Sequence, residues 1–192
     1  MARVAVVTGG GRGIGRAICI ALRDGGWTVA SVDRDEQNAV TDGVHGFGAD
    51  IADIADHASL LQRIETALGP ATCLVNNAGV TSLRRGDMLE LTPESFDRCV
   101  GVNLRGTFFL TQAFARRLLP DPSIAAGATI VTITSANAEI VGENRADYCM
   151  SKAALAMMCK LFAARLAAPG IRVYDIRPGI IETDMTAPAK ER

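Results

Sequence analysis

Residues 3–15 read RVAVVTGGGRGIG, an apolar run that leads directly into a cluster of glycines. The run at 3–8 is short, apolar and rich in valine, which predicts a buried strand. Residues 13–24 place isoleucine, alanine and leucine at helical spacing, and Gly25-Gly26 ends that helix. A strand, a glycine turn and a helix in this order predict the first βα unit of a parallel α/β sheet.

The same alternation continues along the chain. Thr92 is a capping residue followed by Pro93 in the first turn, so a helix is expected to begin there and run to about Leu119. The alternation predicts a Rossmann-type doubly wound parallel sheet of strand order 3-2-1-4-5-6, with helices on both faces, in one domain over residues 1–192. The expected strands are 3–8, 27–33, 44–50, 72–77, 128–134 and 171–177, and the expected helices are 13–24, 53–68, 93–119 and 147–167.

Composition narrows the function classes. The chain has 192 residues with 20 Lys and Arg against 21 Asp and Glu, a net charge of -1, which argues against a nucleic-acid binder. No apolar run approaches the roughly 18 residues that cross a bilayer, and the N-terminus enters a strand pattern without a signal-peptide layout. The five cysteines are widely spaced and form no CxxC pair, so we expect buried thiols, no metal site and a cytoplasmic location.

The glycine cluster predicts a phosphate site. The glycines of residues 9–15 allow a tight turn and a close approach of the backbone to a pyrophosphate, whose charge the helix N-terminus favours. Asp33 ends the next expected strand, where a carboxylate accepts hydrogen bonds from both adenosine ribose hydroxyls and repels a 2′-phosphate. This position favours NAD over NADP. Arg12 and Arg34 argue the other way if either guanidinium pairs with that phosphate, and are otherwise solvated surface charges.

A second group of residues predicts proton transfer. Tyr148 and Lys152 are four residues apart and share one face of a helix, so the lysine charge is expected to lower the tyrosine pKa from about 10. Tyr148 then becomes a general acid and base near neutral pH. Ser135 and Asn76-Asn77 end expected strands at the ligand edge of the sheet. Asn103 is a polar residue in an apolar helical stretch, so it needs a buried partner.

Seven motifs follow one another in a fixed order: TGGGRGIG at 8–15, Asp50-Ile51, NNAG at 76–79, Asn103, Ser135, YCMSK at 148–152 and PGIIET at 178–183. In this order and spacing the chain resembles the short-chain dehydrogenase/reductase family of the single-domain type, from about residue 3 to about residue 187. The resemblance implies an enzyme that interconverts a secondary alcohol and a ketone by hydride transfer with NAD or NADP. The pattern is also similar to 3-oxoacyl-carrier-protein reductases, which prefer NADPH, and to sugar and polyol dehydrogenases.

The resemblance also implies a role for each position. Tyr148 moves a proton to or from the substrate oxygen, Ser135 hydrogen-bonds that oxygen, and Lys152 binds the nicotinamide ribose and tunes the tyrosine. Asn103 anchors a water chain that relays protons to Lys152, or is only a structural tie. Besides Tyr148 and Lys152, the expected cofactor contacts are Gly9, Arg12, Gly13, Ile14, Gly15, Asp33, Arg34, Asp50, Ile51, Asn76, Ala78, Gly79, Pro178, Gly179, Ile180 and Thr183, with Asp50 and Ile51 beside the adenine and Ile180 and Thr183 at the carboxamide.

The sequence says less about the substrate and the assembly. Residues 136–147 are expected to line the pocket and carry asparagines and glutamates, which favours a sugar, a polyol or a small hydroxy compound over a steroid. The helices at 94–119 and 147–167 are apolar nearly all round, which predicts burial on two sides. We therefore expect a homodimer or homotetramer formed through them, unless their apolar residues face only the sheet.

Other classes of function stay open. One is a protein that binds a dinucleotide without turnover because part of its substrate site is absent. Tyr148, Lys152 and Ser135 disfavour a methyltransferase, and the lack of room for a second domain disfavours a nucleotide-sugar epimerase. Members of the single-domain type run to about 250 residues, so we expect a truncated C-terminus without the lid helices and a seventh strand. Residues 184–192 would be only the start of that lid.

Overall fold

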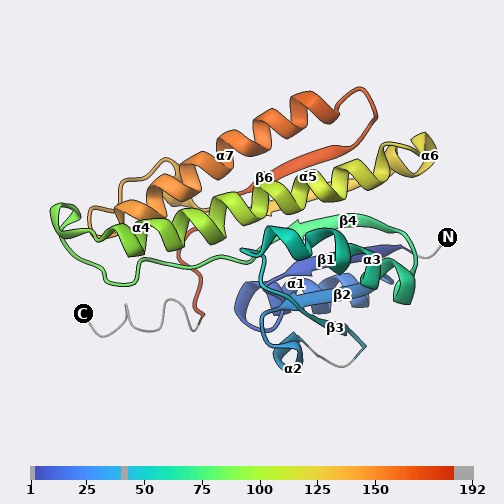
Figure 1. Cartoon of the computed structure of the whole chain (residues 1–192), viewed down its shortest axis with the longest axis horizontal. Helices are drawn as coiled ribbons and strands as arrows, with labels where there is room; N and C mark the ends of the chain where they lie inside the picture. Colours follow the sequence, from blue (N-terminus) through green and yellow to red (C-terminus); the bar gives the residue numbers. More distant parts are fainter. Residues whose placement is uncertain (1–2, 40–42, 184–192) are drawn as a thin grey trace.

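Six parallel strands form one sheet in the order β3-β2-β1-β4-β5-β6 (Figure 1), which confirms the predicted strand order. The computed structural model describes residues 3–39 and 43–183. The chain starts in the middle of the sheet, builds outward to β3, returns to the other side of β1 and continues to β6. The strands are β1 (Val4–Thr8), β2 (Thr28–Asp33), β3 (His45–Gly48), β4 (Ala71–Asn76), β5 (Thr129–Ile133) and β6 (Arg172–Ile176).

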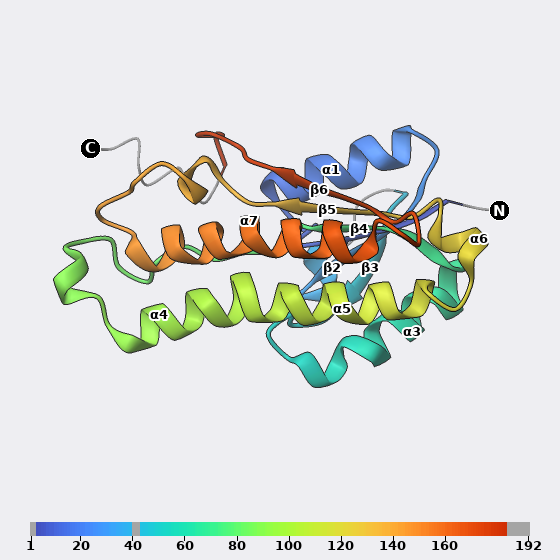
Figure 2. The ribbon, with the colours of Figure 1, turned by 90° about the horizontal axis from the view of Figure 1, so that it is seen from above.

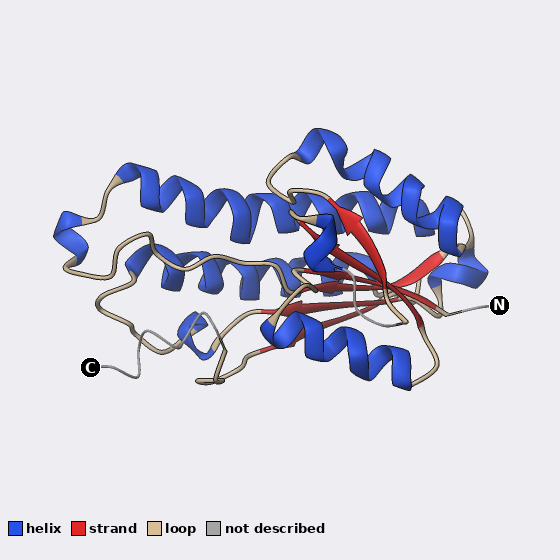
Figure 3. Cartoon of the chain, turned by 90° about the horizontal axis from the view of Figure 1, so that it is seen from below, coloured by secondary structure: helices blue, strands red, loops and turns tan. Residues whose placement is uncertain are grey.

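Helices cover both faces of this sheet (Figure 2, Figure 3), as predicted. One face carries α1 (Gly13–Asp24), and the other carries α3 (His57–Leu68), α5 (Thr107–Leu118) and α7 (Ala146–Leu166). The helix expected over 53–68 begins as a separate 3-10 turn. The shorter described segments are α2 (Glu36–Ala39), η1 (Ile54–Asp56), η2 (Met88–Glu90), α4 (Pro93–Cys99), η3 (Val100–Gly106), α6 (Pro122–Ala125) and η4 (Ala136–Ala138).

β1 explains why the turn after it is firmly held. All of its residues are buried. Val4 and Val6 join the core beneath α3 and α5, whereas Ala5 and Val7 join the smaller core beneath α1. A strand covered on both faces reads as a continuous apolar run, and each buried valine contributes about 1.5–3 kcal/mol relative to exposure. The glycine turn therefore follows a strand that is held firmly in the sheet.

The single helix predicted over 93–119 is interrupted in its middle. Thr92 caps its start, as predicted, by accepting a hydrogen bond from a backbone N–H. Between α4 and α5, however, η3 has π-helical geometry, a form that often occurs at functional sites. A Cβ on Gly106 would lie 2.4 Å from the Ile51 carbonyl oxygen, so the helix passes very close to the loop after β3. The same turn carries the fully buried Asn103.

Candidate active site

A cleft of about 530 Å³ opens at the carboxyl ends of the strands. Its walls come from the turn after β1, the ends of β2, β4 and β5, the N-terminal part of α7 and the segment after β6. Asn76, Asn103 and Ile180 are absent from the walls, although all three were predicted to belong to the site. The predicted residues that do line the cleft are Gly9, Arg12, Gly13, Ile14, Gly15, Asp33, Arg34, Asp50, Ile51, Ala78, Gly79, Ser135, Tyr148, Lys152, Pro178, Gly179 and Thr183.

The turn after β1 is shaped to hold an anion. Gly13 has a φ of 53°, which disfavours any side chain. A Cβ on Gly15 would lie 2.0 Å from the Gly9 carbonyl oxygen, so only glycine fits there. α1 begins with no side-chain cap at Arg12 and no acidic residue in its first turn. Its first N–H groups and its dipole are therefore available to a phosphate.

Asn77 ties this turn to the end of β4. Its Nδ2 donates to the carbonyl oxygens of Thr8 and Gly9, both at 3.0 Å, and Thr8 Oγ1 accepts from the backbone N–H groups of Asn77 and Ala78. Asn76, expected among the cofactor contacts, does not line the cleft. Alternation along β4 turns Asn76 toward α5, where its Nδ2 donates to hydroxyls of the core.

Asp33 lies at the cleft end formed by β2. Its Oδ1 accepts from the Arg34 backbone N–H at 2.8 Å, and its Oδ2 accepts from the Gly11 backbone N–H at 3.3 Å. Arg12 and Arg34 line the same end of the cleft. The carboxylate is therefore held by two backbone N–H groups, and Arg12 and Arg34 line the same cleft.

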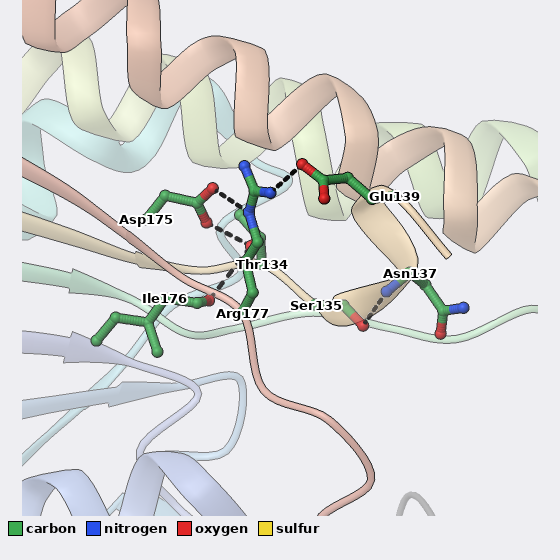
Figure 4. A network of polar contacts seen from close by, with 7 residues as sticks. All are labelled: Thr134, Ser135, Asn137, Glu139, Asp175, Ile176 and Arg177. Carbon is green, nitrogen blue, oxygen red and sulfur yellow. Dashed lines mark hydrogen bonds and ion pairs between the residues drawn. The ribbon is translucent and has the colours of Figure 1, made fainter. Parts of the chain in front are cut away.

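Tyr148, Lys152 and Ser135 meet at the opposite end of the cleft. Lys152 is 4% exposed, and its Nζ donates to the Ile133 carbonyl oxygen at 2.9 Å. The same Nζ lies 5.7 Å from the centre of the Tyr148 ring. Ser135 Oγ accepts from the Asn137 backbone N–H at 3.1 Å (Figure 4) and is also a hydrogen-bond partner of Tyr148. A phenol, a hydroxyl and an ammonium group thus converge on one point.

Burial governs the ionisation of this group. It raises the pKa of Tyr148, whereas the Ser135 hydrogen bond and the charge of Arg145 act in the opposite direction. The predicted net lowering of the tyrosine pKa is therefore wrong, because loss of water around the phenol outweighs the favourable charges. Burial also lowers the pKa of Lys152 to about 8, opposed mainly by the charge of Asp175.

Asn103 clamps the segment that follows β4. Its Oδ1 accepts from the Val80 N–H at 2.7 Å, and its Nδ2 donates to the Val80 carbonyl and to Ser151 Oγ, both at 2.9 Å. A Cβ on Gly79 would lie 3.3 Å from Asn103 Oδ1 and 3.6 Å from Lys152 Nζ. Asn103 thus reaches the back of the Lys152 site without lining the cleft. This geometry fits a structural tie, and the water relay stays a prediction.

Asp147 is a component that the sequence reasoning missed. Its carboxylate is fully buried and accepts from the hydroxyls of Ser82 and Ser95 and from the Tyr148 N–H at 2.8 Å. Burial opposes its ionisation, but the hydrogen bonds outweigh this effect and hold the pKa of Asp147 below its ordinary value. The carboxylate therefore joins the loop after β4 and α4 to the start of α7. The available signal was an acid in the first turn of a helix, directly before the tyrosine.

The segment after β6 runs back to the glycine turn. Pro178-Gly179 and Thr183 line the cleft as predicted, and a Cβ on Gly13 would lie 3.4 Å from Thr183 Cγ2. The Ile180 side chain is 93% exposed, and Ile181 lines the wall instead. The carboxamide contact predicted for the Ile180 backbone stays a prediction.

Some expectations concern absences or residues beyond the described part. Within residues 3–39 and 43–183, no group of three or more His, Cys, Asp and Glu is placed to hold a metal ion. Among the helices of that same part of the chain, none combines the length and apolar character needed to cross a membrane. All five cysteines are free thiols, and four of them are buried. Residues 184–192, predicted to begin a lid, lie outside the described residues.

Comparison with known proteins gives a consistent result. A family model described as short chain dehydrogenase matches residues 3–192. An acetoacetyl-CoA reductase of Rhizobium meliloti is 35% identical over 197 residues, which span 100% of this chain and 79% of that protein. A D-threitol dehydrogenase of Mycolicibacterium smegmatis is 33% identical over 192 residues, covering 95% of this chain and 72% of that protein.

The structural likeness is close. The crystal structure of a 3-oxoacyl-[acyl-carrier protein] reductase from Brucella melitensis in complex with NAD superposes with a TM-score of 0.95 and 41% identity. The match covers 100% of this chain and 79% of that chain. The similarity thus extends over the sheet, the glycine turn and the cleft together.

Proposed function

Because this chain belongs to the short-chain dehydrogenase family, we propose that it interconverts a secondary alcohol and a ketone by hydride transfer with a nicotinamide dinucleotide. The observation that carries the proposal is the layout of one cleft. The glycine turn after β1 lies at one end, and Tyr148, Lys152 and Ser135 meet at the other. A dinucleotide spanning the cleft would bring its nicotinamide to these three side chains.

The residues present fit such a cofactor. Gly15 lets the start of α1 pack directly against the glycine turn, since a Cβ there would strike the Gly9 carbonyl oxygen. The uncapped start of α1 offers N–H donors. Pro178-Gly179 and Thr183 lie where they could contact the nicotinamide end. When bound, the dinucleotide supplies or accepts the hydride, and the protein orients the groups around it.

The chain's own contribution is proton transfer and positioning. In the reducing direction Tyr148 donates its phenolic proton to the carbonyl oxygen as that oxygen gains charge, and in the oxidising direction its phenolate takes the alcohol proton. Ser135 donates a hydrogen bond to the same oxygen. Lys152 stabilises the phenolate by its charge, which offsets part of the effect of burial on the phenol. Asn103 holds the Lys152 site from behind, and we keep the proton relay through water as part of this proposal.

For the cofactor we propose NAD in preference to NADP. The Asp33 carboxylate is held by two backbone N–H groups, so it cannot easily turn away from a ribose in the cleft. A 2′-phosphate would meet this charge, although Arg12 and Arg34 flank it. NADH and NADPH affinities before and after Asp33→Ala test the assignment. Equal affinities in the unchanged protein would refute it.

Two substrate classes have support. The polar residues of 136–147 favour a sugar, a polyol or a small hydroxy compound, and a D-threitol dehydrogenase is among the relatives. A 3-oxoacyl thioester is the second candidate, favoured by the structural match to a 3-oxoacyl-[acyl-carrier protein] reductase. Ile140 and Val141, which are 63% and 82% exposed, add apolar surface to the same segment. Turnover on a panel of polyols, ketones and acetoacetyl-CoA would separate the two classes.

We also propose a homo-oligomer, formed through α5 and α7. A groove of about 430 Å³ runs between these helices and is lined by apolar side chains that include Phe108 and Phe162. Leu161 and Met157 are 60% and 53% exposed on α7. The cytoplasm is the proposed location, because five free thiols fit a reducing compartment.

The central test separates catalysis from binding alone. NADH binding is followed by nicotinamide fluorescence, and turnover is then measured on the panel. We expect Tyr148→Phe to abolish turnover and leave NADH binding within about twofold, because the substitution removes only the proton donor. Unchanged turnover in this variant would refute the catalytic assignment. NADH binding without turnover on any substrate would instead favour a dinucleotide-binding protein.

A further inference from the structure

Asp175, on the face of the sheet covered by α5 and α7, has no part in the reaction described above. The β5–β6 register pairs Ile130 with Val173 and Thr132 with Asp175. Ile130 and Val173 belong to the core covered by α5 and α7, so Thr132 and Asp175 share that face. The side chain of Asp175 is only 16% exposed. A carboxylate buried beneath a helix needs partners that compensate for its lost hydration.

Its direct partners come from the two strand ends (Figure 4). Thr134 Oγ1 donates a short hydrogen bond to Asp175 Oδ1, and Arg177 Nε donates to Asp175 Oδ2 at 2.7 Å. Arg177 also forms an ion pair with Glu139, the residue that follows η4. The Glu139 side chain is 74% exposed, whereas that of Arg177 is 32% exposed. Arg177 thus lies between two carboxylates, of which Asp175 is mostly buried and Glu139 is mostly exposed to solvent.

Lys152 reaches the same corner from α7. Its Nζ donates to the carbonyl oxygen of Ile133, the residue between Thr132 and Thr134. Cys159, two turns further along the same side of α7, is a hydrogen-bond partner of Thr132. Lys152 and Asp175 therefore approach one strand end of β5 from the helix above and from the neighbouring strand.

We propose that Asp175 is the buried counter-charge of Lys152, and that Arg177 sets how strongly this counter-charge acts. Both are positioning residues, since neither lines the cleft. The proposal rests on the role given above to Lys152 as the cation that stabilises the Tyr148 phenolate. It assigns a function to a pair of charges beyond the cleft.

The electrostatics agree in sign with this geometry. Burial lowers the Lys152 pKa, and Asp175 is the foremost charge that raises it again. The thiols of Cys159 and Cys99 are the other titratable groups acting on Lys152, and the Tyr148 ring lies beside it. At Cys159 the charge of Asp175 raises the thiol pKa and that of Arg177 lowers it. The two charges therefore act in opposite directions on this thiol of α7.

This opposition makes a sharp test possible. Asp175→Asn removes the counter-charge, so Lys152 should lose its proton at lower pH. Arg177→Gln removes the cation that masks Asp175, so Lys152 should keep its proton to higher pH. Asp121→Asn, at the exposed cap of α6 and outside this network, serves as the matched control, because asparagine caps a helix equally well. A purely structural tie would lower activity in these variants without moving the pH dependence in opposite directions.

The experiment measures kcat for alcohol oxidation across pH. Its upper limb reports the loss of the Lys152 proton, in a site whose titrations are coupled. We expect this limb to move down by roughly one pH unit in Asp175→Asn and up by roughly half a unit in Arg177→Gln, with Asp121→Asn close to the unchanged protein. Shifts of the same sign, or no shift in either variant, would overturn the proposal.

Two further measurements keep the outcome clear. The pH dependence of NADH affinity follows the charge of Lys152 without turnover, and should move with the same signs. If Asp175→Asn does not fold, Arg177→Gln alone still decides, because it alters the rim of the network. Failure of the proposed function would appear earlier, as no turnover in the unchanged protein. Normal turnover in the unchanged protein, with pH limbs that do not move in either variant, would refute this inference and leave the proposed function intact.

Discussion

Asp147 offers the most quantitative test of how the active site is held together. Its fully buried carboxylate receives hydrogen bonds from Ser82, Ser95 and the Tyr148 backbone. A hydrogen bond to a charged group contributes about 1.5–3 kcal/mol when its removal leaves the partner buried. Asparagine at this position is neutral and keeps one acceptor oxygen, so both serine hydroxyls lose a charged partner and one of them loses its acceptor. We expect Asp147→Asn to lower the free energy of unfolding by about 2–3 kcal/mol at pH 7.

The pH dependence follows from the sign of the pKa shift. The folded-state pKa of Asp147 lies below its ordinary value, so its contribution to stability is present above the unfolded pKa, near 3.9. The contribution is lost as the pH falls through the folded pKa. The Asn variant has no group to titrate there. The stability difference between the two proteins should therefore narrow as the pH falls below about 4.

Urea unfolding followed by circular dichroism, between pH 7 and pH 3, measures both effects. Asp121→Asn is the matched control, because Asp121 is an exposed cap of α6 and asparagine caps a helix equally well. An Asp147→Asn protein that unfolds at the same urea concentration as its parent at pH 7 would refute the reasoning. So would a stability difference that stays constant into acid.

Three other outcomes are expected from the same structure. Gly15→Ala should weaken NADH binding at least about tenfold by fluorescence titration, since its Cβ would strike a carbonyl oxygen, whereas Gly101→Ala, with open space around it, should not. Asn77→Ala removes two hydrogen bonds to the glycine turn and should weaken the same binding by about tenfold, and an unchanged affinity would contradict its role as a tie. Leu161→Glu should reduce the oligomer seen by sedimentation velocity, whereas Leu89→Glu, also exposed, should leave it intact; a monomeric parent would exclude the proposed interface.

The sequence was sufficient for features set by local pattern. Glycines between a strand and a helix predicted the anion-binding turn, and apolar runs of fixed length predicted the sheet and its order. The π-helical turn was beyond reach, because no local pattern in 100–106 distinguishes it from an α-helix. Its close approach at Gly106 is to the Ile51 carbonyl, in a segment far away along the chain. The ionisation of Tyr148 was also beyond reach, since the balance between burial and charge exists only in the folded site.

Other misses could have been avoided by applying strand alternation to polar residues. Asn76 ends β4 and Asn77 directly follows it, so only one of the two side chains can face the cleft, and Asn76 donates to hydroxyls of the core instead. In β6, Val173 and Asp175 face α7, while Tyr174 and Ile176 are 51% and 49% exposed. Asp175 is an acid on the side that faces α7, and the apolar residues on either side of it are exposed. This arrangement reverses the usual pattern of a strand. Such a reversal requires partners for the acid. Thr134 and Arg177 are its direct partners here, and the charge of Lys152 comes from the helix packed over this face.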